Sequence, residues 1–597
     1  MQIRIKTKFF ITIFLFMDLQ IYRKMCKRSK GRGQLLNLKT NWQLDFDYFC
    51  NMDKTEKRFY IYLLLWFIAD LIQASVTNVH ADEAYYALYG QFLDWGYYDH
   101  PPMVGLMTFL SHWAPGYLSI RLLTVLLHSA TLLLVWKTIR PANPTIRDVN
   151  EFCIISLSLF MFVLYGFITT PDAPLLFFVA LFFYLYKLYQ EKNKVWIAML
   201  IGVAIAGMLY SKYMAVLVVA FVLLSNFKLL KDWRMWLAIA FAAMLFMPHV
   251  LWQTFNGFPS LKYHFLVRKD PFSWSYILEF IPSQLLVFNP VCFILALYFC
   301  WRERKNKDTF IRAIVFTTIG FFAFFWVMTI NGHAEPHWTV ATSIPILYIL
   351  FMHTREHVWR KRIMIFVLPF AMIIIIARIA LLFPNVPEQT GFGNRRPLIN
   401  AMHKLCENTP TIFYSSFQYP SIYRYYTGEN ATALSSVYNR MTQYDILQLD
   451  KDLQGKEVAV LSPYSAYGMT KIDDFEFYYK RIQKFQGTNR IDVIVDRQIP
   501  SHDSIELHVT LKNNYSLPFD FKHEEMPVGF DAAYMQQDKL KIEHCIYDGE
   551  NVIPANGSIC GKLKFKRQDE GNYVICLRNH INTSVNSKAM EIPRDND

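Results

Sequence analysis

The sequence predicts a polytopic α-helical membrane protein with about 11 transmembrane helices and a C-terminal extracytoplasmic domain that is part α/β and part β-rich. Three observations support this fold class. Of the 597 residues, 53% are hydrophobic and 17% are aromatic, which is too apolar for a chain of several soluble domains. Apolar segments near the length of a membrane span recur up to residue 383. Short stretches of alternating apolar and polar residues, typical of strands, occupy the C-terminal region.

The candidate spans are recognised by length and composition. A helix that crosses the hydrocarbon core needs roughly 20 mostly apolar residues. The segments that approach this requirement are 59–77, 117–137, 152–169, 174–189, 195–210, 213–227, 235–251, 283–300, 309–330, 338–353 and 363–383.

The distribution of positive charge predicts the orientation. The formal net charge is +13, and lysines and arginines gather in alternate loops between the apolar segments. The positive-inside rule makes those loops cytoplasmic, so we expect a multi-pass protein of the cytoplasmic (inner) membrane with its C-terminal region on the extracytoplasmic side. Since topology accounts for the basic balance, nucleic acid is not an expected partner. The basic loops are 137–147, 187–194, 228–234, 302–307 and 355–362.

Changes in composition divide the chain into four expected parts. Met52 begins a more natural first line of a polytopic protein than Met1, so the N-terminal segment is interpreted either as a cytoplasmic basic lead or as a mis-assigned upstream start. The tail changes character after Pro384, where "TPTIFYSSFQYPSIYRYYTG" predicts a strand and a short helix and "GKEVAVLSP" a further strand. The expected parts are the lead at 1–58, the transmembrane domain at 59–383, an α/β domain at 384–487 and a β-rich, sandwich-like domain at 488–597.

The densest group of ionisable residues follows the first apolar segment. The stretch "HADEAYYALYGQFLDWGYYDHPP" contains the adjacent carboxylates Asp82 and Glu83 and many aromatic residues. A charge near the hydrocarbon is costly unless it is paired or hydrated, which makes both carboxylates functional candidates. The alternative is an exposed helix start whose acidic residues favour the helix dipole. The candidate binding residues around them are Tyr86, Tyr97, Tyr98 and His100.

Other charged residues fall in the loops predicted to lie outside. Asp172, in "TTPDAPLLF", is either a functional carboxylate or a helix cap. Lys212, followed by Tyr213, interrupts a long apolar run and either binds an anion or snorkels to the interface. A solvated loop or an anion site explains the cations of 252–282, and Arg378 either snorkels or binds a lipid phosphate. The remaining candidate binding residues are Arg268, Lys269, Glu335 and His337.

Metal and nucleotide signatures are weak. Glu335 and His337 belong to "NGHAEPHW", where Pro336 breaks the helical spacing that zinc ligands would need. There is no HExxH sequence, no CxxC pair among the nine cysteines and no Walker sequence. We therefore assign no certain cofactor, and a role for a divalent cation stays open.

With these residues in view, the sequence resembles the bacterial family 39-type glycosyltransferases of the GT-C fold, which are related to dolichyl-phosphate-mannose protein mannosyltransferases and aminoarabinose transferases. The resemblance covers about residues 59–450, and it rests on motifs that recur in order. In this sequence they stand at Asp82–Tyr86, Trp95–Pro102, Thr170–Leu175, Ser211–Tyr213 and Glu335–Trp338, with "NRMTQYD" at Asn439–Asp445 in the tail.

The resemblance implies an enzyme that transfers a sugar from a polyprenyl-phosphate donor to a lipid, glycan or protein acceptor at the outer face of the membrane, among membrane lipids. Asp82 would orient or deprotonate the acceptor, Glu83 would support it, and Asp172 would lie near acceptor or donor sugar. Lys212 and the 252–282 cations would hold the donor phosphate. His100 stands where aminoarabinose transferases carry lysine, which weakens the case for that sugar. The alternative function is a transporter or flippase of lipid-linked sugars, which Asp70 inside the first span would suit.

Overall fold

The computed structural model describes residues 52–264, 272–465, 468–536, 539–568 and 571–592. The predicted N-terminal lead up to residue 51 and the candidates Arg268 and Lys269 lie outside these residues. The chain forms two compact units. One contains the described residues up to Ser75 together with Arg121–Met247 and Asp270–Ile379, and the other contains Val76–Ile120, Pro248–Lys269 and Ala380–Asp597.

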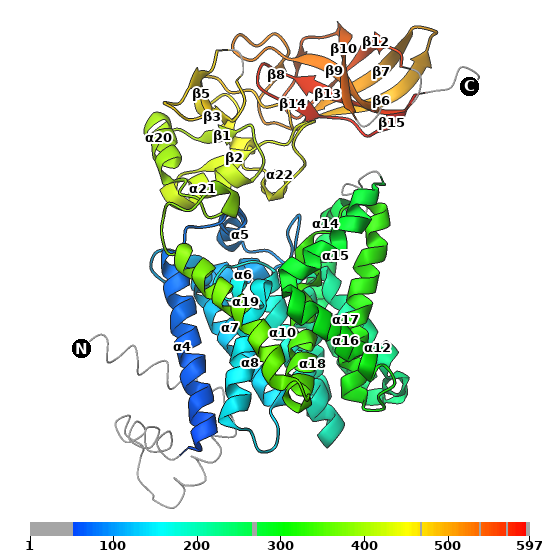
Figure 1. Cartoon of the computed structure of the whole chain (residues 1–597). Helices are drawn as coiled ribbons and strands as arrows, with labels where there is room; N and C mark the ends of the chain where they lie inside the picture. Colours follow the sequence, from blue (N-terminus) through cyan, green and yellow to red (C-terminus); the bar gives the residue numbers. More distant parts are fainter. Residues whose placement is uncertain (1–51, 265–271, 466–467, 537–538, 569–570, 593–597) are drawn as a thin grey trace, which may run out of the picture. The chain divides into compact units, whose positions relative to one another are not determined.

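The first unit is helical (Figure 1). Its longest helices are α4 (Lys54–Val76), α7 (Leu118–Ile139), α10 (Asp172–Lys192), α13 (Trp233–Phe255), α17 (Thr309–Met328) and α19 (Arg360–Ala380). Shorter helices pack among them: α8 (Ile146–Ser158), α9 (Phe160–Leu164), α11 (Val195–Ser211), α12 (Val216–Ser225), α15 (Trp274–Phe288), α16 (Pro290–Glu303) and α18 (Ser343–Glu356). Short 3-10 turns η1 (Tyr213–Ala215), η2 (Phe227–Lys231), η4 (Thr329–Asn331) and η5 (Pro336–Thr342) join several of them.

The protein is a multi-pass membrane protein. Fewer of its helices than the expected 11 are long and apolar enough to cross a membrane. Six helices of the described chain qualify, or seven if α15 and α16, which bend by 104° at Asn289, form one span. The predicted span 152–169 is divided at Leu159 into α8 and α9. The two short segments predicted at 195–210 and 213–227 are present as α11 and as η1 followed by α12, but both are shorter than a full span. Apolar periodicity locates these helices, whereas Asn289 and Leu159 interrupt them through local backbone geometry.

The second unit begins with two short helices, α5 (Ala81–Gln91) and α6 (Met103–Ser111), and also contains α14 (Pro259–Lys262). Its α/β part has a five-stranded mixed sheet in the order β2-β1-β3-β5-β4. The strands are β1 (Thr411–Phe413), β2 (Ala431–Ala433), β3 (Val458–Ser462), β4 (Thr470–Lys471) and β5 (Tyr478–Ile482). The helices are α20 (Arg396–Cys406), α21 (Gln418–Thr427) and α22 (Gln443–Leu447), with 3-10 turns η6 (Glu388–Thr390) and η7 (Lys451–Leu453). The predicted strand and helix of "TPTIFYSSFQYPSIYRYYTG" are confirmed as β1 and α21.

The C-terminal part is an antiparallel sheet of eight strands, in the path β14-β13-β9-β10-β12-β7-β6 with β15 beside β13. The sheet encloses a single apolar core to which strands from both ends of the path contribute, as expected for a sandwich-like arrangement. The strands are β6 (Ile491–Pro500), β7 (Ser504–Asn513), β9 (Gly529–Gln536), β10 (Lys539–Gly549), β12 (Ser558–Lys566), β13 (Asn572–Arg578), β14 (Thr583–Val585) and β15 (Met590–Glu591), with β8 (Phe519–Asp520) pairing β11 (Val552–Ile553) separately.

One apolar core joins the α/β part to the beginning of the second unit. Ala81 and Ala84 of α5 are buried in the same cluster as Met402 of α20 and Ile422 of α21. This packing sets the position of α5, the helix that carries Asp82 and Glu83. This core contains residues from both sides of the predicted domain boundary at residue 384. The boundary therefore stays a prediction.

Candidate active site

The helix α5 starts with a capping box that orients the two predicted carboxylates. The His80 ring accepts a hydrogen bond from the Asp82 backbone N–H at 3.2 Å, and Glu83 Oε2 accepts one from the His80 backbone N–H at 3.1 Å. Glu83 is fully buried, so its carboxylate secures the helix start. Glu83 thus stabilises the start of the helix that carries Asp82, and its supporting role in the reaction stays a prediction.

Asp82 is the accessible member of the pair. Its side chain is 40% exposed, and its Oδ2 lies 3.7 Å from His80 Nδ1. Desolvation by the surrounding protein raises the pKa of Asp82; His80 opposes this shift, while the charges of Asp99 and Glu83 add to it. A reachable carboxylate with a raised pKa is suited to accept a proton, because a base works best when its pKa approaches the working pH.

A buried ion pair lies behind α5. Asp99 accepts hydrogen bonds from Arg440 Nη1 at 2.6 Å and from the Tyr85 hydroxyl at 2.8 Å. Tyr89 donates a longer one, at 3.3 Å. The Arg440 guanidinium also lies 4.5 Å from the centroid of the Tyr263 ring, within the range of cation–π contact. The charge on Asp99 is thus satisfied from several directions.

Aromatic residues of the same stretch pack against one another and carry polar groups that form hydrogen bonds. The Tyr86 hydroxyl lies 3.2 Å from His100 Nε2, and Tyr97 stacks on Tyr89 with ring centroids 3.9 Å apart. The backbone N–H of Tyr98 donates to Gln443 of α22 at 2.8 Å. Burial raises the pKa of Tyr98 to about 12, so its hydroxyl stays protonated at neutral pH and remains able to donate. The structure therefore brings the candidate site residues within 80–102 close together.

Asp99 and Arg440 were missed as candidates although both stand inside motifs that the sequence displays. Asp99 belongs to the "YYDHPP" block and Arg440 to "NRMTQYD", and 341 positions separate them. The two motifs meet in space through this pair and through Gln443, which accepts from Tyr98 and donates its backbone N–H to Tyr85. The signal in the sequence was that a motif of the tail accompanies the motifs of the loops. That signal does not tell which residue of one motif contacts which residue of the other.

In the first unit, Asp172 and Lys212 lie together. Lys212 Nζ donates to Asp172 Oδ1 at 2.7 Å, and both residues are buried. Asp172 is the first residue of α10, Lys212 follows the end of α11, and Tyr213 opens the next 3-10 turn. Two predicted residues are thus brought into contact, and each neutralises the other.

Arg378 also has protein partners. Its Nη1 lies 2.9 Å from Asp70 Oδ1, and the other oxygen of Asp70 lies 2.7 Å from His128 Nδ1. Asp70 has no exposed surface, so its charge inside a span is compensated by neighbouring helices.

Glu335 and His337 are half-buried at the start of η5, and His333 Nε2 lies 3.9 Å from Glu335 Oε2. Within the described residues, no group of three or more His, Cys, Asp or Glu side chains could hold a metal ion. The cysteines that the structure describes, including Cys406, Cys545, Cys560 and Cys576, are free.

Comparison with known proteins gives three findings. Residues 99–252 match the family described as dolichyl-phosphate-mannose-protein mannosyltransferase. The chain is 26% identical over 311 residues to the lipid A galacturonosyltransferase RgtD of Rhizobium johnstonii, a match that covers 48% of this chain and 64% of that relative. The chain therefore spans less than two thirds of the length of this curated relative.

Among solved structures, ArnT from Cupriavidus metallidurans in the apo state superposes with a TM-score of 0.53 at 12% identity, covering 70% of this chain and 97% of ArnT. The same protein bound to undecaprenyl phosphate gives a TM-score of 0.52 at 13% identity, with the same coverage. The chain has the GT-C fold, and its predicted resemblance to the family 39-type glycosyltransferases is confirmed.

Proposed function

We propose that this protein is a membrane glycosyltransferase that moves a sugar from a polyprenyl-phosphate donor to an acceptor at the extracytoplasmic face of the inner membrane. The observation that carries the proposal is Asp82, an accessible carboxylate of raised pKa at the start of a helix whose position is set by buried contacts. The family match over residues 99–252 includes Asp99 and His100 of the same region.

The chemistry requires one base and a set of positive charges. Asp82 would accept the proton of the acceptor hydroxyl as that oxygen attacks the anomeric carbon. The bond from this carbon to the donor phosphate oxygen breaks, and the departing phosphate needs charge stabilisation more than a proton. Attack opposite the phosphate inverts the anomeric centre.

The predicted binding residues take proposed roles within this scheme. Tyr86, Tyr97, Tyr98 and His100 would surround the sugar or acceptor, and Glu83 would maintain the backbone that presents Asp82. Asp172, Lys212, Tyr213, Arg378, Glu335 and His337 of the first unit, and Arg268 and Lys269 outside the described residues, are proposed as donor-binding residues on the sequence resemblance alone. Since Lys212 is paired with Asp172, a donor phosphate would have to share or replace that carboxylate.

The acceptor class follows from the relatives only as a proposal. The similar RgtD is described as acting on lipid A, and the similar ArnT structure holds undecaprenyl phosphate. A lipid acceptor is therefore the first to test, followed by glycan and protein acceptors.

The test is sugar transfer in proteoliposomes that contain radiolabelled polyprenyl-phosphate sugars and lipid, glycan or protein acceptors. Wild type should incorporate label into one acceptor fraction, and Asp82→Asn should lose at least 99% of that activity. Glu407→Gln, which removes an exposed carboxylate of the same unit, serves as the matched control and should retain activity.

The same assay separates the transferase from a transporter of lipid-linked sugars. A transporter would move label between leaflets without forming a labelled acceptor, and Asp82→Asn would leave that movement intact. Asp70, the residue that suited a transporter, is accounted for by its contacts with Arg378 and His128.

A further inference from the structure

A groove between α8 and α19 lies in the first unit, away from every residue assigned above. It has a volume of about 540 Å³, within the range of roughly 300–1,000 Å³ that small-ligand sites occupy. Four lining residues of α8 and three of α19 recur at helical spacing, so one face of each helix forms a wall. They are Arg147, Asn150, Glu151, Ile154, Lys361, Met364 and Ile365.

The groove changes from cationic to apolar along its length. Arg147 and Lys361 lie near the first turns of their helices, whereas Ile154 and Ile365 lie further along the same faces. Seven residues of helix separate Arg147 from Ile154, a rise of about 10 Å. A ligand that matches both ends therefore has an anionic head and an apolar chain.

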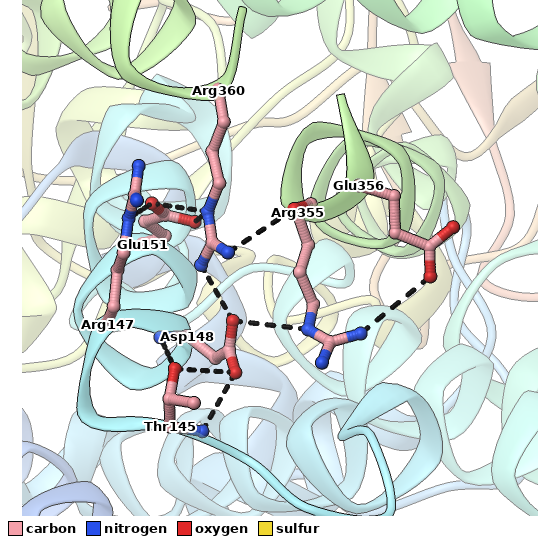
Figure 2. Close-up of polar contacts among 7 residues, drawn as sticks. All are labelled: Thr145, Arg147, Asp148, Glu151, Arg355, Glu356 and Arg360. Carbon is pink, nitrogen blue, oxygen red and sulfur yellow. Dashed lines mark hydrogen bonds and ion pairs between the residues drawn. The ribbon is translucent and has the colours of Figure 1, made fainter. Parts of the chain in front are cut away.

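Salt bridges join α8 to α19 and to α18 (Figure 2). Arg360 donates to Glu151 at 2.7 Å and to Asp148 at 2.7 Å, and Arg355 of α18 donates to Asp148 at 3.2 Å. Burial acts to raise the pKa of Asp148, but hydrogen bonds from the backbone N–H and the hydroxyl of Thr145, together with Arg360 and Arg355, lower it. The carboxylates of this cluster are thus already engaged.

Positive charge remains available at the groove. Arg147 uses Nε to bind Glu151 at 2.8 Å, and its side chain is 46% exposed. Lys361 is exposed at the same opening. Arg58 is linked to the groove through hydrogen bonds, because it donates to the Tyr62 hydroxyl, which in turn donates to the lining residue Asn150.

The surface around the groove fits a lipid environment. Only 22% of the most apolar stretch of α19 is buried inside the protein, so most of its apolar surface is accessible to lipid. Basic pockets between transmembrane helices are suited to the phosphate of anionic headgroups.

We propose that the groove between α8 and α19 binds an anionic phospholipid, whose phosphate lies between Arg147 and Lys361 and whose acyl chain lies along Ile154, Met364 and Ile365. Charge complementarity at one end and apolar lining at the other select this occupant. The site is separate from the proposed transfer reaction and does not depend on it.

Native mass spectrometry of the full-length protein in detergent tests the proposal, with dioleoylphosphatidylglycerol, dioleoylphosphatidylcholine and sn-glycerol 3-phosphate as probes. Wild type should retain the anionic lipid at least tenfold more strongly than the zwitterionic lipid, and it should not retain the soluble phosphate. Arg147→Gln/Lys361→Gln should weaken binding of the anionic lipid about thirtyfold, because each of the two cations contributes about 1 kcal/mol near an anionic headgroup and every 1.4 kcal/mol is about a tenfold change.

The matched control is Lys305→Gln/Lys307→Gln, which removes the same charge from exposed positions of the same unit outside the groove. The control should bind the anionic lipid as wild type does. Equal binding of both lipids by wild type, equal losses in both double variants, or retention of sn-glycerol 3-phosphate as strong as that of the lipid would each overturn the proposal. Equal melting temperatures in phosphatidylcholine establish that both variants are folded.

Discussion

At the scale of single residues, Asp82 and Glu83 show how two adjacent carboxylates at one helix start come to differ in burial. Glu83 completes a capping box and is fully buried, whereas Asp82 keeps 40% of its side chain exposed. The difference arises because consecutive helical residues point in directions about 100° apart. Of the two carboxylates, only Asp82 keeps exposed surface.

The pH dependence of transfer should report the environment of Asp82. Because its pKa is raised above 3.8, the base is active above that raised value and is lost as pH falls through it. We expect the acid limb of a kcat/KM profile to lie above pH 3.8. His80→Asn, which keeps a capping side chain but removes a charge that lowers the Asp82 pKa, should move this limb to higher pH. His502→Asn, at an exposed position, should leave it unchanged; an unmoved limb in His80→Asn would contradict the assignment.

Loss of the Asp99 charge should destabilise the second unit. Asp99→Asn leaves the Arg440 guanidinium without its ion partner, at a cost of about 2 kcal/mol, reduced from that of a fully buried pair because Arg440 is 31% exposed. Glu457→Gln removes a pair with Arg481 in which both side chains are about 40% exposed, and it should cost less than about 1 kcal/mol. Thermal unfolding in detergent compares the two variants, and equal melting temperatures would refute the difference.

At the scale of elements, α5 and α6 pack closely because Gly90 has no side chain. A Cβ at Gly90 would lie 2.4 Å from Thr108 Oγ1 and 2.9 Å from the backbone nitrogen of Phe109. Alanine in a helix interior is favoured over glycine by about 1 kcal/mol. Gly90→Ala should nevertheless lower the melting temperature, since the contact with backbone cannot be relieved by a rotamer change. A higher melting temperature would show that the helices separate at little cost.

The pair formed by Asp172 and Lys212 links the start of α10 to the end of α11. Asp172→Asn and Lys212→Met should each destabilise by about 3 kcal/mol, because each leaves a buried charge unpaired. The double variant should lose less than the sum of the two. Melting temperatures of the four proteins form the cycle, and strict additivity would show that the ion pair is not what joins the helices. Glu407→Gln again controls for removal of a carboxylate.

At the scale of the whole molecule, the two parts of the C-terminal tail share an apolar core. Met526, which precedes β9, is buried with Ile412, Val458 and Ile482 of the five-stranded sheet. Met526, which lies beyond the predicted division at residue 488, therefore contributes to the core of the five-stranded sheet.

Met526→Ala should weaken both sheets together. We expect a loss of about 2–4 kcal/mol from the cavity that it creates. Hydrogen exchange should then accelerate in β3, whose Val458 lies in this core, and also in β7, which belongs to the same part of the tail as Met526. Ile546→Ala, at a position that is 72% exposed, should change neither strand. Acceleration confined to the residues after 488 would instead indicate independent domains.

Local sequence patterns predicted much of the fold. Apolar length and composition located the helices around residues 59–383, and alternation located strands such as β6, β7, β12 and β13. Fewer helices than predicted are long enough to span, because Leu159 and Asn289 interrupt apolar runs and because α11, α12 and α18 are short. Such breaks and ends depend on backbone geometry as well as on hydropathy.

The sequence by itself determined the membrane character of this protein, the order of its elements and the motifs that reveal its resemblance, because composition and period are local properties. Only the tertiary structure decided that Asp99 pairs with Arg440, Asp172 with Lys212 and Arg378 with Asp70. Partners so far apart in the chain leave no periodic signal, and the free energy that joins them comes from removing their charges from water together.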